Sequence, residues 1–375
     1  MYKKNVLIIL CIVSLFTFKN GFGVEFINKR GSMLNNPWVN DVPAKFAAID
    51  EKVDNKKGRQ IDHKNIITWP RYSTHIKNTY KGLAGRENHF QGINRLSGWL
   101  GLGQYLVLSG GDPHRNESHL FIAKDDKFVK EIALDNVFWH AGGMQVVGKY
   151  LAVPLENAED HKSKIVFYDM TRPENPQKIS TEIVRPNRRC GTVSMTRLID
   201  GHYLVVIWVD SDGQREQNRF DFYYSNGTIL EKGFPTVPTT KVYHNQVVNI
   251  TQSSVKKCGT YQMVNLVNDV NGTLYLIGTW NTSSAAPIIN GKDYAHLLQI
   301  SFNTTTKKAA VNYVAEKHFY CKTGIFQPLR CCFNAGAGVD IPSQDSIAIY
   351  AVTHWLDSKS DYVRYYVFRN YDHKK

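Results

Sequence analysis

The 375-residue sequence predicts an all-β fold, a five-bladed β-propeller. Three observations predict it. One short pattern opens five successive segments, each segment continues with strand-like runs, and aromatic residues make up 12 % of the chain. Aromatic and β-branched residues favour strands over helices. A ring of such segments would bury both faces of each sheet against its neighbours, which a lone four-stranded sheet cannot do.

The recurring pattern is a small residue, an apolar residue and a polar residue in succession. The small residues are Gly92, Gly143, Thr192, Thr260 and Gly338, and the polar ones are Asn94, Gln145, Ser194, Gln262 and Asp340. The first openings are about 50 residues apart, the length of one propeller blade. Regular strand spacing would also suit a β-sandwich, but a sandwich does not explain why the same signature reopens every segment.

The fifth segment ends on its third strand, close to the end of the chain. We expect the strand-like run "HKNIITWPRY", residues His63–Tyr72, to supply the missing fourth strand and close the ring. Pro70 is tolerable there because a blade's outermost strand is an edge. A sixth blade built from residues 24–88 is the alternative. Within that region, Asp41–Val53 predicts a short capped helix packed on the rim.

The repeat openings resemble the β-propeller superfamily over roughly residues 63–370. The resemblance is carried in particular by "HAGGMQVVGKYLAVPLE" followed by "KIVFYDMTRPENP". It is similar to the blades of exported propeller proteins, and it implies the fold. It implies no activity, because function depends on sites that are grafted onto folds.

The N-terminal residues predict export. Lys3 and Lys4 precede an apolar run over Val6–Phe18, and small residues follow at Gly21 and Gly23, as in a signal peptide over residues 1–23. A membrane anchor is the alternative, but the run is shorter than a bilayer requires. We expect an extension over residues 24–62, a single propeller domain over residues 63–375, and a secreted or extracytoplasmic protein without a transmembrane span after signal removal.

Export permits disulfides and N-glycans. The disulfide candidates are Cys190, Cys258, Cys321, Cys331 and Cys332. This odd number leaves one thiol free or paired between chains. Their spacing does not suit zinc, and we expect no metal site. The glycosylation candidates lie in polar stretches expected to be exposed, at Asn116, Asn226, Asn249, Asn271, Asn281 and Asn303.

The pattern also predicts what faces the propeller axis. Side chains alternate along a strand, so the five polar residues would form a ring in the channel. The alternative is that they only hold trapped water. Three positions before the small residues lie His89, His140, Arg189 and Lys257. In a chain of formal charge +13, they predict a basic mouth that binds a carboxylate, phosphate, sulfate or acidic sugar. A generally basic surface is the alternative.

Hydrolysis of a glycosidic bond usually needs two carboxyl groups. The inward register offers Asp340, and Glu156, Asp160, Asp210 and Asp212 follow second strands. The sequence lacks a G-x-S-x-G elbow, a Walker loop, an H-E-x-x-H motif and a C-x-x-C motif. "VDSDG" at Val209 lacks the remainder of a calcium loop. We therefore expect no cofactor.

These observations predict a secreted, non-enzymatic propeller that recognises a glycan or protein ligand, with an anionic group bound at the basic mouth. Nucleic acid is not expected as a partner. Aromatic side chains could stack on sugars or pack between blades, and they include Trp99, Trp139, Trp208, Trp280 and Trp355. The alternative function is an extracellular hydrolase, similar to glycoside hydrolases, that uses Asp340 and a loop acid.

Overall fold

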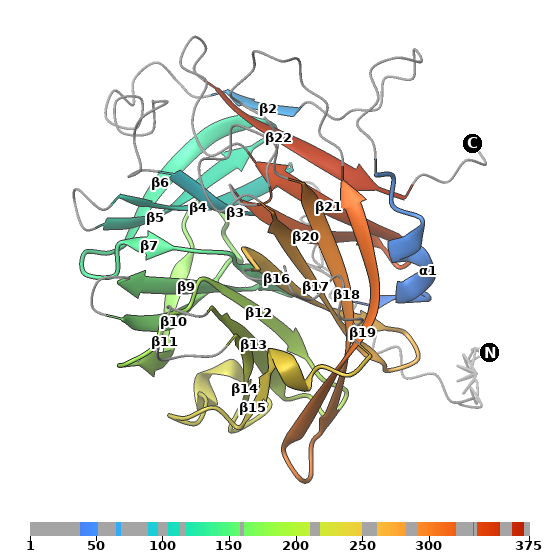
Figure 1. Cartoon of the computed structure of the whole chain (residues 1–375). Helices are drawn as coiled ribbons and strands as arrows, with labels where there is room; N and C mark the ends of the chain where they lie inside the picture. The colour runs from blue at the N-terminus through green and yellow to red at the C-terminus, as the bar shows by residue number, and fades with distance from the viewer. Residues whose placement is uncertain are drawn as a thin grey trace, which may run out of the picture.

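The computed structural model describes residues 38–51, 65–68, 89–96, 104–112, 117–157, 161–210, 218–249, 261–282, 292–319, 333, 336–352 and 362–370. The predicted signal peptide lies outside these ranges. The described strands form antiparallel sheets that fan around one axis (Figure 1). No helix among the described residues is long and apolar enough to cross a membrane.

Five blades follow one another along the chain, which confirms the predicted propeller. Blade 1 contains β3 (His89–Leu96), β4 (Tyr105–Asp112), β5 (Glu117–Lys124) and β6 (Lys127–Asp135). Blade 2 contains β7 (His140–Ala141), β8 (Gln145–Val147), β9 (Tyr150–Asn157), β10 (Lys162–Asp169) and β11 (Gln177–Arg185). Blade 3 contains β12 (Thr192–Arg197), β13 (Tyr203–Val209), β14 (Arg219–Tyr224) and β15 (Thr240–Tyr243), with short 3₁₀ turns at Leu230–Lys232 and His244–Gln246.

Blade 4 contains β16 (Met263–Asp269), β17 (Leu274–Asn281), β18 (Asp293–Asn303) and β19 (Lys308–Phe319). Blade 5 contains β20 (Ala337–Ser343), β21 (Ser346–Val352), β22 (Tyr362–Arg369) and β2 (Asn65–Thr68). Because β2 pairs antiparallel with β22, the chain's N-terminal part completes its last blade. The predicted closure by an N-terminal strand is therefore confirmed.

The inner strands are β3, β7 with β8, β12, β16 and β20. Neighbouring inner strands touch as parallel pairs, as at Gly92 with Ala337 and at Gly143 with Thr192. All inner strands run in the same direction along the axis. We call the end where they begin the start face, and the end where they finish the end face. The second-to-third strand connections lie on the start face, and the first-to-second and third-to-fourth turns lie on the end face.

The apolar core is divided among the spaces between blades. Five buried clusters are present in the described part of the chain, and each joins two neighbouring blades. Strand β13 shows the sequence basis, because its seven residues YLVVIWV are all buried and it must be apolar on both faces. Trp208 and Trp280 belong to the cluster between blades 3 and 4, so they pack inside the protein.

Helix α1 (Val42–Ala47) ties the N-terminal extension to blades 4 and 5. Its N-cap residue Asp41 accepts a hydrogen bond from the Ala44 N–H, and Val42 and Phe46 are buried in the cluster between these blades. Lys317 donates to the carbonyl oxygens of Ala47 and Ile49 beyond the helix end. The helix is shorter than the predicted Asp41–Val53. Before it, β1 (Trp38–Val39) pairs in parallel with β16.

Two modification predictions need correction. Cys190 is a free, fully buried thiol rather than half of a disulfide. Asn281 is only 7 % exposed, and its Nδ2 donates to Asp293, so it does not present the exposed amide that a glycan requires. Four sequon asparagines are exposed: Asn226, Asn249, Asn271 and Asn303. The remaining candidates Asn116, Cys258, Cys321, Cys331 and Cys332 lie outside the described residues.

Candidate functional site

Of the five polar residues of the repeat, Asn94 and Gln145 hydrogen-bond to other blades, whereas Ser194 donates to the Val206 carbonyl of its own blade. Gln145 is buried, and its Oε1 accepts from the Met195 N–H at 3.1 Å and the Leu266 N–H at 2.9 Å. Its Nε2 donates to the Leu266 carbonyl at 2.8 Å, so one side chain links blades 2, 3 and 4. Asn94 likewise donates to the Met144 carbonyl of blade 2 at 2.8 Å. These amides replace backbone pairing where the strands converge.

The predicted register of the fourth repeat was wrong by three residues. Gln262 lies just before β16, where its N–H donates to the Thr279 carbonyl. Asn265 occupies the ring position instead, and its Oδ1 accepts from the Val339 N–H at 3.1 Å. Met263 stands where other blades carry a small residue and projects toward Gly143 and Gly338. The sequence signal failed because this blade places its largest inner side chain at that position.

Asp340 is buried on β20 and faces a neighbouring blade. Burial, and after it the charge of Asp340, raises the pKa of Tyr350 to about 12. Tyr350 accepts a hydrogen bond from Arg95. Asp340 occupies the repeat position of Gln145, which pairs with Ala152 on β9. Glu156 lies four residues farther along β9, about 13 Å toward the start face. The carboxylate of Glu156 is bound by His140 and Arg189, so it belongs to an ion-pair cluster rather than to a pair with Asp340.

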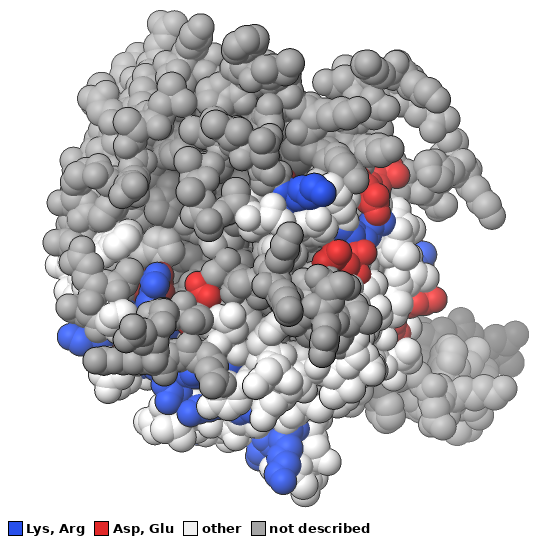
Figure 2. Space-filling model, in the orientation of Figure 1, with Lys and Arg blue, Asp and Glu red and all other residues white. Residues whose placement is uncertain are grey.

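Two of the four residues expected to form a basic mouth, His140 and Arg189, are bound by a buried carboxylate of the protein itself. His140 Nδ1 lies 3.1 Å and an Arg189 guanidinium nitrogen 3.2 Å from Oε1 of buried Glu156. Burial alone would raise the pKa of Glu156, but the hydrogen bonds and charges of His140 and Arg189 lower it to about 2. The side chain of His89, at the start of β3, and Lys257 lie outside the described residues. Across the face shown in Figure 2, described Lys and Arg side chains form separate groups rather than one patch.

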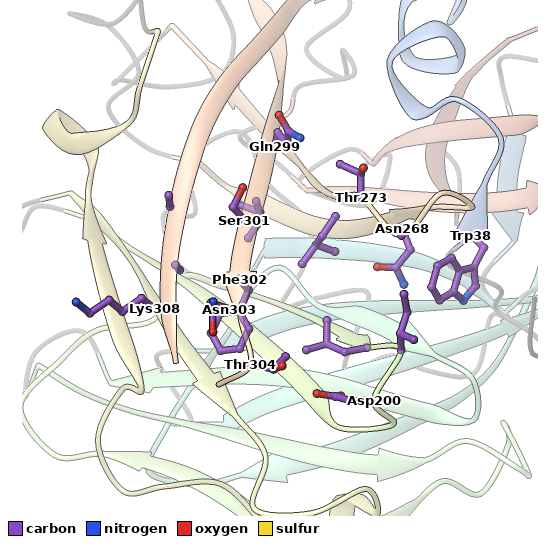
Figure 3. A pocket seen from close by; sticks show the side chains of 17 residues that line it. Trp38, Asp200, Asn268, Thr273, Gln299, Ser301, Phe302, Asn303, Thr304 and Lys308 are labelled. Carbon is purple, nitrogen blue, oxygen red and sulfur yellow. The ribbon is translucent and has the colours of Figure 1, made fainter. Parts of the chain in front are cut away.

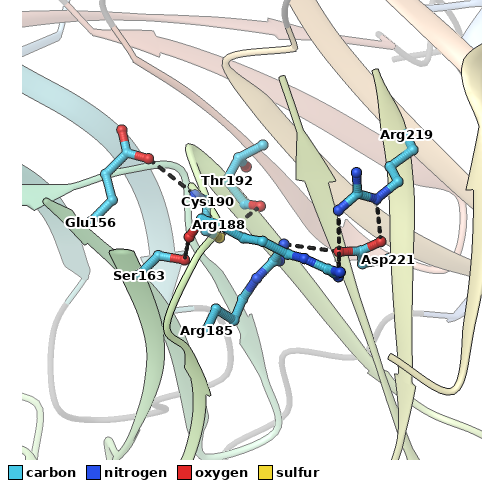
Figure 4. Close-up of polar contacts among 8 residues, drawn as sticks. All are labelled: Glu156, Ser163, Arg185, Arg188, Cys190, Thr192, Arg219 and Asp221. Carbon is cyan, nitrogen blue, oxygen red and sulfur yellow. Dashed lines mark hydrogen bonds and ion pairs between the residues drawn. The ribbon is translucent and has the colours of Figure 1, made fainter. Parts of the chain in front are cut away.

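A charged cluster between blades 2 and 3 was not predicted (Figure 4). Asp221 is fully buried and accepts from Arg185 at 2.8 Å and from Arg219 Nε at 2.8 Å. A third guanidinium, that of Arg188, lies 3.7 Å from the same carboxylate. A sequence signal exists, because Arg219 and Asp221 face the same side of an otherwise apolar strand. The partner Arg185 comes from a different blade, which the sequence does not show.

A groove of about 860 Å³ opens on the end face between blades 3 and 4 (Figure 3). Its walls come from the turn after β12, the turn after β16, the hairpin joining β18 to β19, and Trp38 on β1. The polar and aromatic lining residues are Trp38, Asp200, Asn268, Thr273, Gln299, Ser301, Phe302, Asn303, Thr304 and Lys308. Sequence analysis missed this groove because its residues come from four separate segments.

The groove is held in shape by its own contacts. Trp38 pairs in the β1–β16 ladder with Asn268, whose Nδ2 donates to Thr196 Oγ1 at 2.7 Å. Asp200 Oδ2 accepts from the Tyr224 hydroxyl at 2.8 Å. Most polar groups in the wall are uncharged amides and hydroxyls. Such groups beside an aromatic ring fit a ligand that carries hydroxyl groups and apolar faces.

No protein-family profile matches the chain, and no curated protein sequence matches it. Solved structures with a similar fold include a thermostable family-43 glycoside hydrolase, with 11 % identity and a TM-score of 0.42 over 79 % of this chain and 94 % of that one. Another is a family-43 β-xylosidase/α-arabinofuranosidase from a compost microbial metagenome, in complex with xylotriose, with 12 % identity and a TM-score of 0.43 over 78 % and 93 %.

A third similar structure is a mannose phosphorylase from Leishmania mexicana in complex with phosphate ion. It shares 11 % identity and a TM-score of 0.38, over 77 % of this chain and 86 % of that one. The likeness of all three concerns the arrangement of the blades.

Proposed function

We propose that this protein is an extracytoplasmic carbohydrate-binding propeller that holds an uncharged oligosaccharide segment in the groove between blades 3 and 4. The observation that carries the proposal is the groove's wall, in which Trp38 lies beside Asn268 and Phe302 lies beside Asn303, with the amide of Gln299 farther along the same groove. Sugar rings present apolar C–H faces that pack on aromatic rings, and their hydroxyl groups exchange hydrogen bonds with amides.

The charges around the groove support an uncharged ligand. Asp200 lines the groove, and its carboxylate accepts hydrogen bonds from the Tyr224 hydroxyl and the His202 N–H. A carboxylated or sulfated sugar would bring a second negative charge near it. Lys308 supplies one exposed cation on the opposite wall. Neutral sugars avoid this repulsion.

A glycan array with the purified mature protein, followed by calorimetry on each retained oligosaccharide, tests the proposal. Gln299→Ala should weaken binding up to about tenfold, because it removes one hydrogen-bonding amide. Trp38→Leu should weaken it further through lost stacking. Gln177→Ala is the matched control, since Gln177 is an exposed amide on β11.

The thermal unfolding midpoint of each variant is checked first, so that lost binding is not confused with lost folding. Unchanged affinity in both folded groove variants would contradict the assignment of the groove. An array that retains no glycan would contradict carbohydrate binding altogether.

The second candidate is an extracellular glycoside hydrolase, which the shared blade arrangement of the family-43 enzymes brings forward. Glu156 is bound by His140 and Arg189, which does not suit the acid partner of Asp340. Of the other predicted acids, Asp210 follows β13, and Asp160 and Asp212 lie outside the described residues. Release of reducing ends from arabino- or xylo-oligosaccharides, abolished by Asp160→Asn or Asp212→Asn, would favour this candidate over simple binding.

A further inference from the structure

Three arginine side chains surround the buried carboxylate of Asp221, far from the groove on the end face. Arg185 ends β11 and Arg219 begins β14, so two strands of neighbouring blades bring their guanidinium groups to one carboxylate near the start face (Figure 4). The Arg185 side chain is 1 % exposed and the Asp221 side chain is fully buried. Asp221 therefore contacts two buried guanidinium groups.

Arg185 is incompletely satisfied. One terminal nitrogen donates to Asp221 at 2.8 Å, but Nε and the other terminal nitrogen are buried without a hydrogen-bond partner. Buried charged donors that lack an acceptor are costly, and native proteins rarely leave them so. An oxyanion offers such a guanidinium both hydrogen-bond acceptors and the opposite charge.

The other titratable groups described near Arg185 are neutral or already bound. Burial raises the pKa of the Cys190 thiol, and it raises the pKa of Tyr223 to about 12, so both groups are neutral near pH 7. Glu156 is ionised, but it is bound by His140, Arg189 and the Cys190 N–H. Asp221 is the one remaining carboxylate that contacts Arg185 among the described residues.

We propose that this cluster is an anion site, in which Arg185 binds a phosphate, sulfate or carboxylate group between blades 2 and 3. Arg188 provides the access, since its side chain is 31 % exposed and its guanidinium lies 3.7 Å from Asp221. Guanidinium groups match such oxyanions in both charge and hydrogen-bond geometry. The anion is either a free ion or a substituent of a larger ligand, such as a sulfated sugar.

Calorimetric titration of the purified protein with sodium sulfate and with sodium phosphate, at constant ionic strength set with sodium chloride, tests the site. Calorimetry is needed because sulfate stabilises proteins in general. We expect saturable binding of at least one of the two anions. Arg188→Ala should weaken it at least about tenfold, as expected for a charged hydrogen bond. Arg172→Ala, which removes an exposed arginine elsewhere on blade 2, should leave it unchanged.

Arg185→Gln should abolish binding; if that variant does not fold, Arg188→Ala decides. A titration with a sulfated disaccharide distinguishes the two sources, because tighter binding than inorganic sulfate indicates a substituent and equal binding indicates a free ion. Heats that do not saturate, or equal affinity in Arg188→Ala and wild type, would overturn the site. Neutral oligosaccharide binding in the groove is measured separately, so either proposal can fail alone.

Discussion

Glu156 is the buried carboxylate that binds the basic side chains at the start face between blades 2 and 3. Its buried carboxylate holds His140, Arg189 and the Cys190 N–H together. His140 and Arg189 were expected to bind an external anion, but this carboxylate already occupies them. A buried charge is tolerated there because several partners surround it, and removing one partner from such a group is far more costly than removing an exposed charge.

Glu156→Gln should lower the free energy of unfolding at pH 7 by about 3 kcal/mol, because Arg189 loses its counter-charge. The folded pKa of Glu156, about 2, lies below its ordinary value. The stabilisation it contributes is therefore present above its ordinary pKa and is lost as pH falls. Urea unfolding should show wild type losing about 2 kcal/mol more than the variant between pH 5 and pH 3.

The matched control is Glu182→Gln, at an exposed glutamate on β11 whose ion pair with Lys178 is long, at 3.8 Å. A surface pair of this kind should change stability by less than about 1 kcal/mol. Equal pH dependence in wild type and Glu156→Gln would refute the assigned role of Glu156.

The inner strands open on small residues because their backbones come close to those of other blades. A Cβ on Gly338 would lie 1.6 Å from the Ile93 carbonyl oxygen, and one on Gly142 would lie 1.9 Å from that of Gly191. The backbones of neighbouring blades therefore touch at these positions. Three residues beyond Gly142, the side chain of Gln145 cross-links β8 to β12 and β16. The close approach of the backbones and the hydrogen bonds of the side-chain amides together keep the inner strands in place around the axis.

Gly338→Ala should destabilise the protein by several kcal/mol, roughly 4 or more, because β20 and β3 must separate to admit a methyl group. Gly191→Ala is the matched control, since a Cβ there meets nothing within 4 Å. Chemical denaturation of both variants checks the difference. If the two lost equal stability, the contact between β20 and β3 would not be the reason for the glycine.

At the scale of the whole molecule, the chain closes its ring with a segment that comes before the first blade. Strand β2 pairs with β22, while α1 covers the apolar cluster between blades 4 and 5. Each of the five clusters joins two neighbouring blades, so every blade takes part in two of them. Leaving out the closing segment would expose both a sheet edge and an apolar face.

A chain that begins at Trp38 keeps α1 and β2 and should unfold cooperatively at the wild-type midpoint. A chain that begins at Tyr72 lacks both and should aggregate or lose its cooperative transition. Circular dichroism during thermal unfolding, with light scattering, distinguishes the outcomes. Wild-type unfolding of the shorter chain would show that the closing strand is dispensable.

Much of the fold was predictable because its signals are local. The small–apolar–polar opening recurs in the inner strands of blades 1, 2, 3 and 5, and the strand-like His63–Tyr72 run was the natural completion of the last blade. Asp41 indicated the start of the helix but not its early end at Ala47. In blade 4 the rule failed, since Met263 fills the space that small residues leave in other blades.

The sequence by itself determined the recurring blades and the closing strand, because strand periodicity and steric limits act on neighbouring residues. It favoured five blades and left six as the alternative. The tertiary structure alone decided the pairing of Arg189 with Glu156, the joining of Arg185 to Asp221 and the groove beside Trp38. Ion pairs and cavities form between side chains that only the packing of blades brings together, and their strength depends on burial, which the order of residues along the chain does not reveal.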